Sequence, residues 1–135
     1  MQRFKEVIRG WLGRESIQTP VGARAHFRLC YGELPVVDLF VQDGVWTLSY
    51  TDEFRSQDKL RPLVEFPDID RTYTSEDLWP SFSMRIPSLQ QSSIRRIVDR
   101  EKIDETNEVE LLRRFGRRSI TNPFELCDCS EPVEA

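Results

Sequence analysis

The chain has 135 residues, of which 39% are hydrophobic, 31% charged and 10% aromatic, enough apolar side chains for the core of one domain. This composition excludes wholesale disorder, and no apolar run approaches the roughly 20 residues that a membrane-spanning helix needs. The net charge of −4 is uneven: +4 over residues 1–32, −7 over 33–84, +3 over 85–118 and −4 over 119–135. An acidic middle does not suit a protein that lives on nucleic acid, because phosphate binding needs a net positive face.

The arginine and cysteine content indicates what kind of partner the protein binds and in which compartment it works. Arginine supplies 16 of the 19 cations, which favours a protein interface, although the base composition of the genome explains the bias equally well. Three cysteines cannot all form disulfide pairs, and Cys127 and Cys129 are too close together in the sequence for a disulfide that would stabilise the fold. The first residues lack the apolar region of a signal peptide. We therefore expect a soluble, cytoplasmic protein with reduced thiols.

The N-terminal residues show a helical pattern. The spacing of the apolar residues predicts a helix over residues 3–12, with one apolar stripe formed by Phe4, Val7, Ile8, Trp11 and Leu12. Gly13 is the expected stop, and a loop follows around Pro20 and Gly22. We expect the stripe to pack on the protein's own core, although the segment could serve as a separate arm.

From Ala25 the period changes from 3.6 to 2, which predicts a strand through Tyr31. Two further strands, 36–42 and 45–50, flank Asp43-Gly44, the strongest short signal for a hairpin. A two-residue turn there pairs Val41 with Trp46, Leu39 with Leu48 and Val37 with Tyr50. All six side chains then share one face, as the apolar pattern requires.

The middle of the chain gives weaker local signals. Residues 51–54 resemble a turn or a single helical turn, and 63–66 form a short extended piece between prolines. Residues 68–77 are acidic and polar, so we expect an exposed loop. Residues 82–86 alternate and predict a further strand.

The last third is helical. Ser88-Leu89-Gln90-Gln91 fits a capping box that starts a helix whose buried stripe is Ile94, Ile97 and Val98. A second helix is expected from Asn107 to Gly116, with Val109, Leu112 and Phe115 facing inwards. The expected fold is α+β: a small antiparallel meander with an Asp-Gly hairpin, packed with C-terminal helices plus an N-terminal helix. Its parts are a helix and linker over 1–24, the α+β domain over 25–126 and an acidic tail over 127–135.

The inventory of catalytic residues is thin. His26 is the one histidine, and in a strand it is far more often a half-buried sheet residue than a base. Cys127 and Cys129 with this histidine fall short of four zinc ligands, and the six glycines form no phosphate loop. The acidic residues of 68–77 are better explained as a solvated loop than as a cation site. We expect no enzyme activity, no metal and no cofactor.

Two features stand out for partner binding. The first is Leu78-Trp79-Pro80-Ser81-Phe82, since tryptophan is a preferred interface anchor, although core packing is the commoner role of a tryptophan. The second is a cluster of four arginines around a helix end, Arg113, Arg114, Arg117 and Arg118. These arginines could be solvated, pair with the chain's own acidic segments, or contact an acidic partner or nucleic acid.

The order and spacing of several segments resemble the HipA N-terminal region, the small α+β subdomain that precedes the kinase in HipA-type toxins. The segments are Asp43-Gly44-Val45-Trp46-Thr47-Leu48-Ser49-Tyr50, Arg61-Pro62-Leu63, Trp79-Pro80-Ser81-Phe82-Ser83-Met84-Arg85-Ile86-Pro87-Ser88, the run from Glu110 to Arg118, and the run from Ile120 to Leu126. The resemblance covers roughly residues 30–126. Residues 3–12 and the acidic tail have no counterpart in it.

The resemblance implies a part of a bacterial toxin–antitoxin system. The catalytic Asp and the metal-binding residues of the kinase are missing from this sequence. The chain therefore resembles HipS, the small component of split HipBST systems, which implies an antitoxin that binds and inhibits a HipT-like serine/threonine kinase. A HipB-like helix-turn-helix protein is a further expected partner. The expected partner-binding residues are Trp79, Phe82, Arg85, Arg113, Arg114, Arg117 and Arg118.

Two alternatives stay open at this point. One is a nucleic-acid-binding accessory protein of an operator complex, acting through the basic N-terminal helix and the arginine cluster, although the charge distribution does not favour direct contact. The other, which we favour least, is an enzyme that depends on His26.

Overall fold

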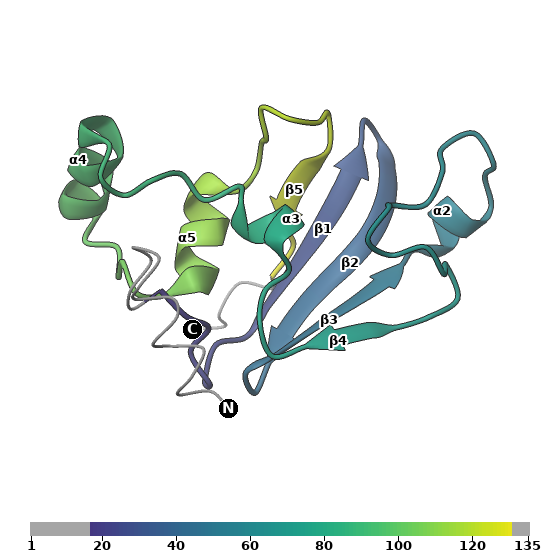
Figure 1. Ribbon diagram of the computed structural model, residues 1–135, viewed down its shortest axis with the longest axis horizontal. Coiled ribbons are helices and arrows are strands. Elements are labelled where there is room, and N and C mark those ends of the chain that lie inside the picture. Colours follow the sequence, from purple (N-terminus) through teal and green to yellow (C-terminus); the bar gives the residue numbers. More distant parts are fainter. Residues whose placement is uncertain (1–16, 131–135) are drawn as a thin grey trace.

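The computed structural model describes residues 17–130, so the helix expected over residues 3–12 and the end of the acidic tail lie outside the described part. The strands are β1 (Ala25–Tyr31), β2 (Leu34–Gln42), β3 (Val45–Tyr50), β4 (Tyr73–Ser75) and β5 (Glu125–Asp128). They form one antiparallel sheet in the order β4-β3-β2-β1-β5 (Figure 1). The helices in the described residues are α2 (Asp52–Arg55), α3 (Pro80–Ser83), α4 (Ser92–Glu101) and α5 (Glu108–Phe115). The expected α+β class is confirmed.

The hairpin of β2 and β3 has the register that the sequence predicts. Val41 pairs with Trp46, Leu39 with Leu48 and Val37 with Tyr50, and all six side chains are buried. Asp43 and Gly44 both have positive φ, 54° and 77°, as a type I′ turn requires. The strand predicted from Ala25 is confirmed as β1, and the short turn after β3 is the helix α2, capped by the Thr51 side chain.

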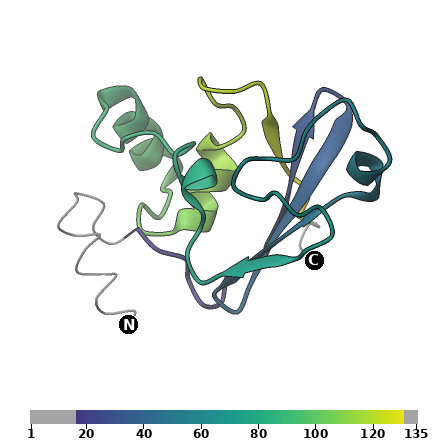
Figure 2. The ribbon, with the colours of Figure 1, turned by 45° about the vertical axis from the view of Figure 1, so that its right-hand side comes forward.

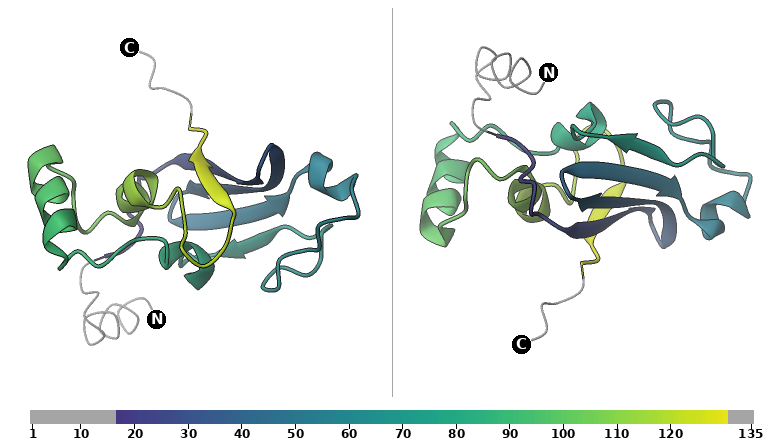
Figure 3. Two further views of the ribbon diagram at one scale, coloured as in Figure 1. Left: turned by 90° about the horizontal axis from the view of Figure 1, so that it is seen from above. Right: turned by 90° about the horizontal axis from the view of Figure 1, so that it is seen from below.

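The core lies between one face of the sheet and the helices α3 and α5, which contact each other beside it (Figure 2). The helix α4 stands apart from this core, at the end of the molecule away from the sheet in both views of Figure 3. Its predicted stripe is confirmed only in part, since Val98 is buried while Ile94 and Ile97 are half-buried. No helix among residues 17–130 is long and apolar enough to cross a membrane.

Residues ahead of β1, expected to be linker, contribute to the fold. Ile17 belongs to the core, and Gln18 pairs with the start of α5 through two backbone hydrogen bonds of 3.0 Å. Trp46 Nε1 donates to Thr19 Oγ1 at 2.8 Å, and Thr19 Oγ1 donates to Glu108 Oε1 at 3.0 Å. This half-buried chain of hydrogen bonds ties the segment to both the sheet and α5.

Two predictions between the hairpin and α3 are wrong. Residues 63–66 are a turn and not an extended piece, because Phe66 N–H donates to the Leu63 carbonyl at 3.0 Å. The loop expected over 68–77 contains the strand β4, whose Tyr73 pairs with Leu48 of β3. The strand is only three residues long and polar, so the pairing comes from the neighbouring β3 and not from a local apolar pattern.

The strand predicted over residues 82–86 is also wrong, because this segment contains the end of α3 and a turn. Pro80 occupies the first helical turn, and the Trp79 carbonyl accepts from Phe82 N–H at 2.9 Å. Phe82 and Ile86 are buried as expected, but Met84 between them is exposed and Arg85 is buried. Burial therefore follows the spacing i, i+3, i+4 of a helix and not the alternation of a strand.

The capping box predicted at Ser88 is wrong, whereas the prediction for the second helix is confirmed. Ser88 Oγ accepts from Gln90 N–H at 3.2 Å and so makes a turn, and α4 begins four residues later, at Ser92. The helix α5 begins after Asn107, whose side chain accepts from Glu110 N–H at 3.1 Å, and ends at Gly116.

Candidate partner-binding site

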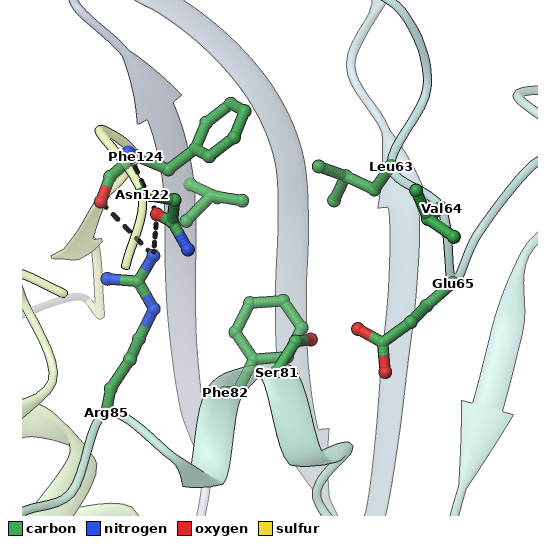
Figure 4. A pocket seen from close by; sticks show the side chains of 9 residues that line it. Leu63, Val64, Glu65, Ser81, Phe82, Arg85, Asn122 and Phe124 are labelled. Atoms are coloured by element: carbon green, nitrogen blue, oxygen red, sulfur yellow. Dashed lines mark hydrogen bonds between the residues drawn. The ribbon is translucent and has the colours of Figure 1, made fainter. Parts of the chain in front are cut away.

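A pocket opens where three segments meet: α3 with the turn after it, the turn at residues 63–66, and the loop that leads into β5 (Figure 4). Its volume is about 140 Å³. Leu63 and Val64 line one wall, Asn122 and Phe124 the other, and Phe82 and Arg85 the base. The pocket is therefore mostly apolar, with a single cation at its base.

Arg85 is 7% exposed and holds the loop before β5 in place. Nη1 donates to the carbonyls of Gly116 at 3.1 Å and Arg117 at 3.2 Å. Nη2 donates to Asn122 Oδ1 at 3.2 Å and to the Phe124 carbonyl at 3.1 Å. Nε is buried and has no hydrogen-bond partner in the described part of the chain. Burial lowers the pKa of Arg85, but an arginine stays charged at any physiological pH.

Four large apolar side chains are exposed on segments that line this pocket or adjoin the residues that line it. Val64, on its wall, is 96% exposed, and the exposed Tyr31 packs its ring against Phe124 with centroids 5.6 Å apart. Met84 and Ile120 are exposed on the segments that supply Arg85 and Asn122. We call Tyr31, Val64, Met84 and Ile120 the apolar frame. Where exposed apolar side chains gather on a folded domain, they mark a surface that another molecule covers.

The two expected aromatic contacts lie beside and inside the pocket. Trp79 is half-buried, with its ring edge-on to Phe66 at 5.2 Å and 86°. Phe82 is buried in the core and exposes only its contribution to the base of the pocket. Arg85 links both groups of expected residues, because it follows α3 and binds the carbonyl of Arg117. No motif in the sequence points to Val64, Asn122 or Tyr31 as site residues, since only the fold brings them to the pocket.

The four clustered arginines pair with acidic residues of the same chain. Arg113 binds Glu110 at 2.9 Å and Asp128 at 2.8 Å. Arg114 binds Glu101 at 2.8 Å, and its hydrogen bond lowers the pKa of that carboxyl. Arg117 and Arg118 both approach Glu125, at 3.9 and 3.2 Å. Exposed pairs of this kind contribute little stability, but they reduce the net positive face that phosphate binding needs.

The other titratable residues on the sheet form a structural cluster. His26 Nε2 lies 2.8 Å from Asp38 Oδ1, and its ring stacks on Phe40 with centroids 4.2 Å apart. Arg28 Nε donates to the same carboxyl at 2.8 Å. Burial alone would raise the pKa of Asp38, but the hydrogen bonds from Arg28 and His26 outweigh it and lower the pKa. The interpretation of His26 as a half-buried sheet residue is confirmed.

The cysteines add no second site. Cys30, Cys127 and Cys129 are free thiols, and burial is the main cause that raises the pKa of Cys30 and Cys129. A raised pKa makes a thiol less reactive, because the thiolate is the nucleophile. Within residues 17–130, no three His, Cys, Asp or Glu side chains are grouped so that they could hold a metal ion.

The comparison with known protein families agrees with this geometry. The profile of the HipA N-terminal domain matches residues 28–120, which contain the second half of β1, all of β2 to β4, all the described helices and most of the pocket. No curated protein matches the chain significantly. The matched residues make up more than half of the sequence, and this chain belongs to the HipA N-terminal domain family.

Proposed function

We propose that this protein is a non-catalytic, antitoxin-like subunit that binds a HipA-type serine/threonine kinase of the shorter HipT kind and inhibits it. Membership of the HipA N-terminal domain family supports a toxin–antitoxin-related context. The 135 residues contain no glycine-rich phosphate loop, so the proposed action on the kinase is through contact and not through chemistry of its own.

The apolar frame around the pocket is the observation that carries the proposal. Four large side chains that could have been buried on folding remain in solvent, and three of them belong to separate connecting segments of the chain. Protein interfaces combine such an apolar centre with a polar rim. Here the rim is supplied by the paired arginines Arg117 and Arg118, whose side chains are 66% and 80% exposed. The rim and the frame together fit a protein surface better than a nucleic acid.

Substitution of Val64 by aspartate tests the proposal. Val64 is 96% exposed, so Val64→Asp should leave the free energy of unfolding within about 0.5 kcal/mol of the wild type. If the kinase buries this side chain, the lost apolar contact alone costs about 1.5–3 kcal/mol of binding free energy. The dissociation constant should then rise about 10- to 100-fold, and inhibition of the kinase should weaken in parallel.

Val21→Asp is the matched control. Val21 is 74% exposed and lies beside Gly44 in the β2–β3 turn, away from the pocket. The control variant should bind and inhibit the kinase as the wild type does. Unchanged binding by Val64→Asp, or equal weakening by both variants, would remove the apolar frame from the interface.

A further inference from the structure

Among residues 17–130, no carboxylate hydrogen-bonds to the buried guanidinium of Arg85. All four groups that accept from its guanidinium are neutral: three backbone carbonyls and the Asn122 side-chain amide. Its fifth donor, Nε, is buried and unpaired within the described residues. A buried charge is costly unless an opposite charge compensates it, and a buried donor without an acceptor adds to this cost. An anion that joined this arrangement would supply both an opposite charge and an acceptor for Nε.

The edge of the guanidinium that carries Nε and Nη2 lies on the pocket side, although Nε itself is covered in the free protein. In Figure 4 the nitrogen atoms Nε and Nη2 lie on the side of Phe82, while Nη1 points away towards the end of α5. Nε and Nη2 form the edge of an arginine that can bind both oxygens of a carboxylate at once. Asn122 Oδ1 occupies part of this edge and also accepts from Phe124 N–H, so an entering carboxylate has to displace an exposed side chain that makes two hydrogen bonds.

We propose that this pocket receives an aspartate or glutamate side chain of the partner kinase, which pairs with Arg85 through the Nε and Nη2 edge. This inference rests on the proposed function for the identity of the partner, and on Arg85 alone for the chemistry. The entering carboxylate replaces the neutral amide oxygen of Asn122 and supplies an acceptor for Nε. The apolar frame receives the apolar residues that flank the acidic residue in the partner.

One acidic residue of the chain itself lines the pocket. Glu65 lies on the opposite wall, comes from the 63–66 turn and is exposed to solvent. Solvent and salt screen its charge, whereas Arg85 acts from a site of low dielectric constant, where the same charge has a larger effect. The pocket therefore favours an anion despite this carboxylate.

The free protein permits a test that needs no kinase. Because Arg85 Nε is buried, its N–H proton should exchange slowly and give a resolved cross-peak in a ¹H–¹⁵N NMR spectrum at neutral pH. Isobutyrate, a carboxylate with a small aliphatic end, should shift this cross-peak saturably at constant ionic strength, whereas isobutyramide should not. The shift should be absent in Asn122→Asp, which places a carboxylate on the same edge permanently. No shift, an equal shift with the amide, or a larger shift with inorganic phosphate would overturn the assignment of a carboxylate site.

The second arm measures kinase binding. Asn122→Asp should raise the dissociation constant for the kinase about tenfold, because the site is already filled, and Asn122→Ala should leave it within about twofold. Equal binding by the wild type and Asn122→Asp would overturn this inference and leave the proposed function standing. If the wild type itself does not bind the kinase, the proposed function fails, and the isobutyrate titration alone decides whether the anion site exists.

Discussion

Replacing Asn122 by aspartate should stabilise the free protein, because it adds a carboxylate beside the buried guanidinium of Arg85. The two side chains have nearly the same shape. Oδ1 of Asn122 already accepts from Arg85 Nη2 at 3.2 Å and from Phe124 N–H at 3.1 Å, so a carboxylate can keep both bonds. A charge-assisted hydrogen bond is roughly twice as strong as a neutral one, which would add about 1–2 kcal/mol. Since residue 122 is exposed, we discount this gain to about 1 kcal/mol.

The dependence of this gain on pH provides an internal control. The new carboxyl should have a pKa in the folded protein below its value of about 3.9 in the unfolded chain, because Arg85 stabilises the charged form. A lowered pKa adds stability that is fully present above the unfolded value and is lost as the pH falls through the folded value. The gain should therefore be present at pH 7 and disappear near pH 3.

Urea and thermal unfolding of the wild type, Asn122→Asp and Asn122→Ala measure the effect. For a domain of this size, 1 kcal/mol corresponds to a rise of about 4 °C in the melting temperature at pH 7. Asn122→Ala should lower the melting temperature, because it removes an acceptor from Arg85 and from Phe124. An Asn122→Asp protein that is no more stable than the wild type at pH 7, or equally stabilised at pH 3, would refute the claim that Arg85 has no carboxylate partner among residues 17–130.

Three further substitutions test other parts of the structure. Thr19→Val should lower the free energy of unfolding by about 2–3 kcal/mol, because Trp46 Nε1 loses its acceptor in the core. Thr19→Ser keeps the hydroxyl and should cost under about 1 kcal/mol. Equal costs for the two variants would exclude the hydroxyl as the cause. Asp38→Asn should lower the free energy of unfolding by about 2 kcal/mol at pH 7, because Arg28 loses its ionised partner. The pKa of Asp38 is lowered in the folded protein, so its carboxylate stabilises the fold above about pH 4. Urea titrations should therefore show the difference between the two proteins vanish as the pH falls below about 4. If Trp79 is an anchor of the interface, Trp79→Ala should weaken kinase binding by at least about 2 kcal/mol. Trp79→Phe is the control variant that keeps the packing against Phe66. Undiminished binding of Trp79→Ala in a pull-down would remove Trp79 from that role.

The hairpin could be predicted from the sequence because its determinants are local. Asp43 and Gly44 tolerate the positive φ of a tight turn, and the alternation on either side fixes the register. The strand β4 could not be predicted in the same way. Its three residues carry no apolar pattern, and they form a strand only because β3 offers an unpaired edge.

The segment around α3 shows how one unexpectedly buried residue can make a prediction of secondary structure wrong. Alternation of Phe82, Met84 and Ile86 predicts a strand only if Arg85 is assigned to the surface because of its charge. The structure buries Arg85 and exposes Met84, so the true pattern is helical. Charged side chains are usually exposed, and the exception at Arg85 coincides with the candidate site, where such exceptions are expected.

The candidate site itself was predictable only in part. The sequence predicts Trp79, Phe82 and Arg85 as site residues, and they lie together on α3 and the turns at its two ends. The opposite walls come from Val64 and Asn122, which are far from α3 in the sequence. Neither residue carries a motif, and only the packing of the 63–66 turn and the β5 loop brings them to the pocket.

The decisive measurement is a titration of the purified protein into a HipA-type kinase from the same genome, with complex formation and phosphorylation of a protein substrate followed together. We predict a stoichiometric complex and loss of kinase activity as the complex forms. No complex, or a complex whose kinase activity is unchanged, would contradict the proposal that this protein inhibits a HipA-type kinase by binding to it.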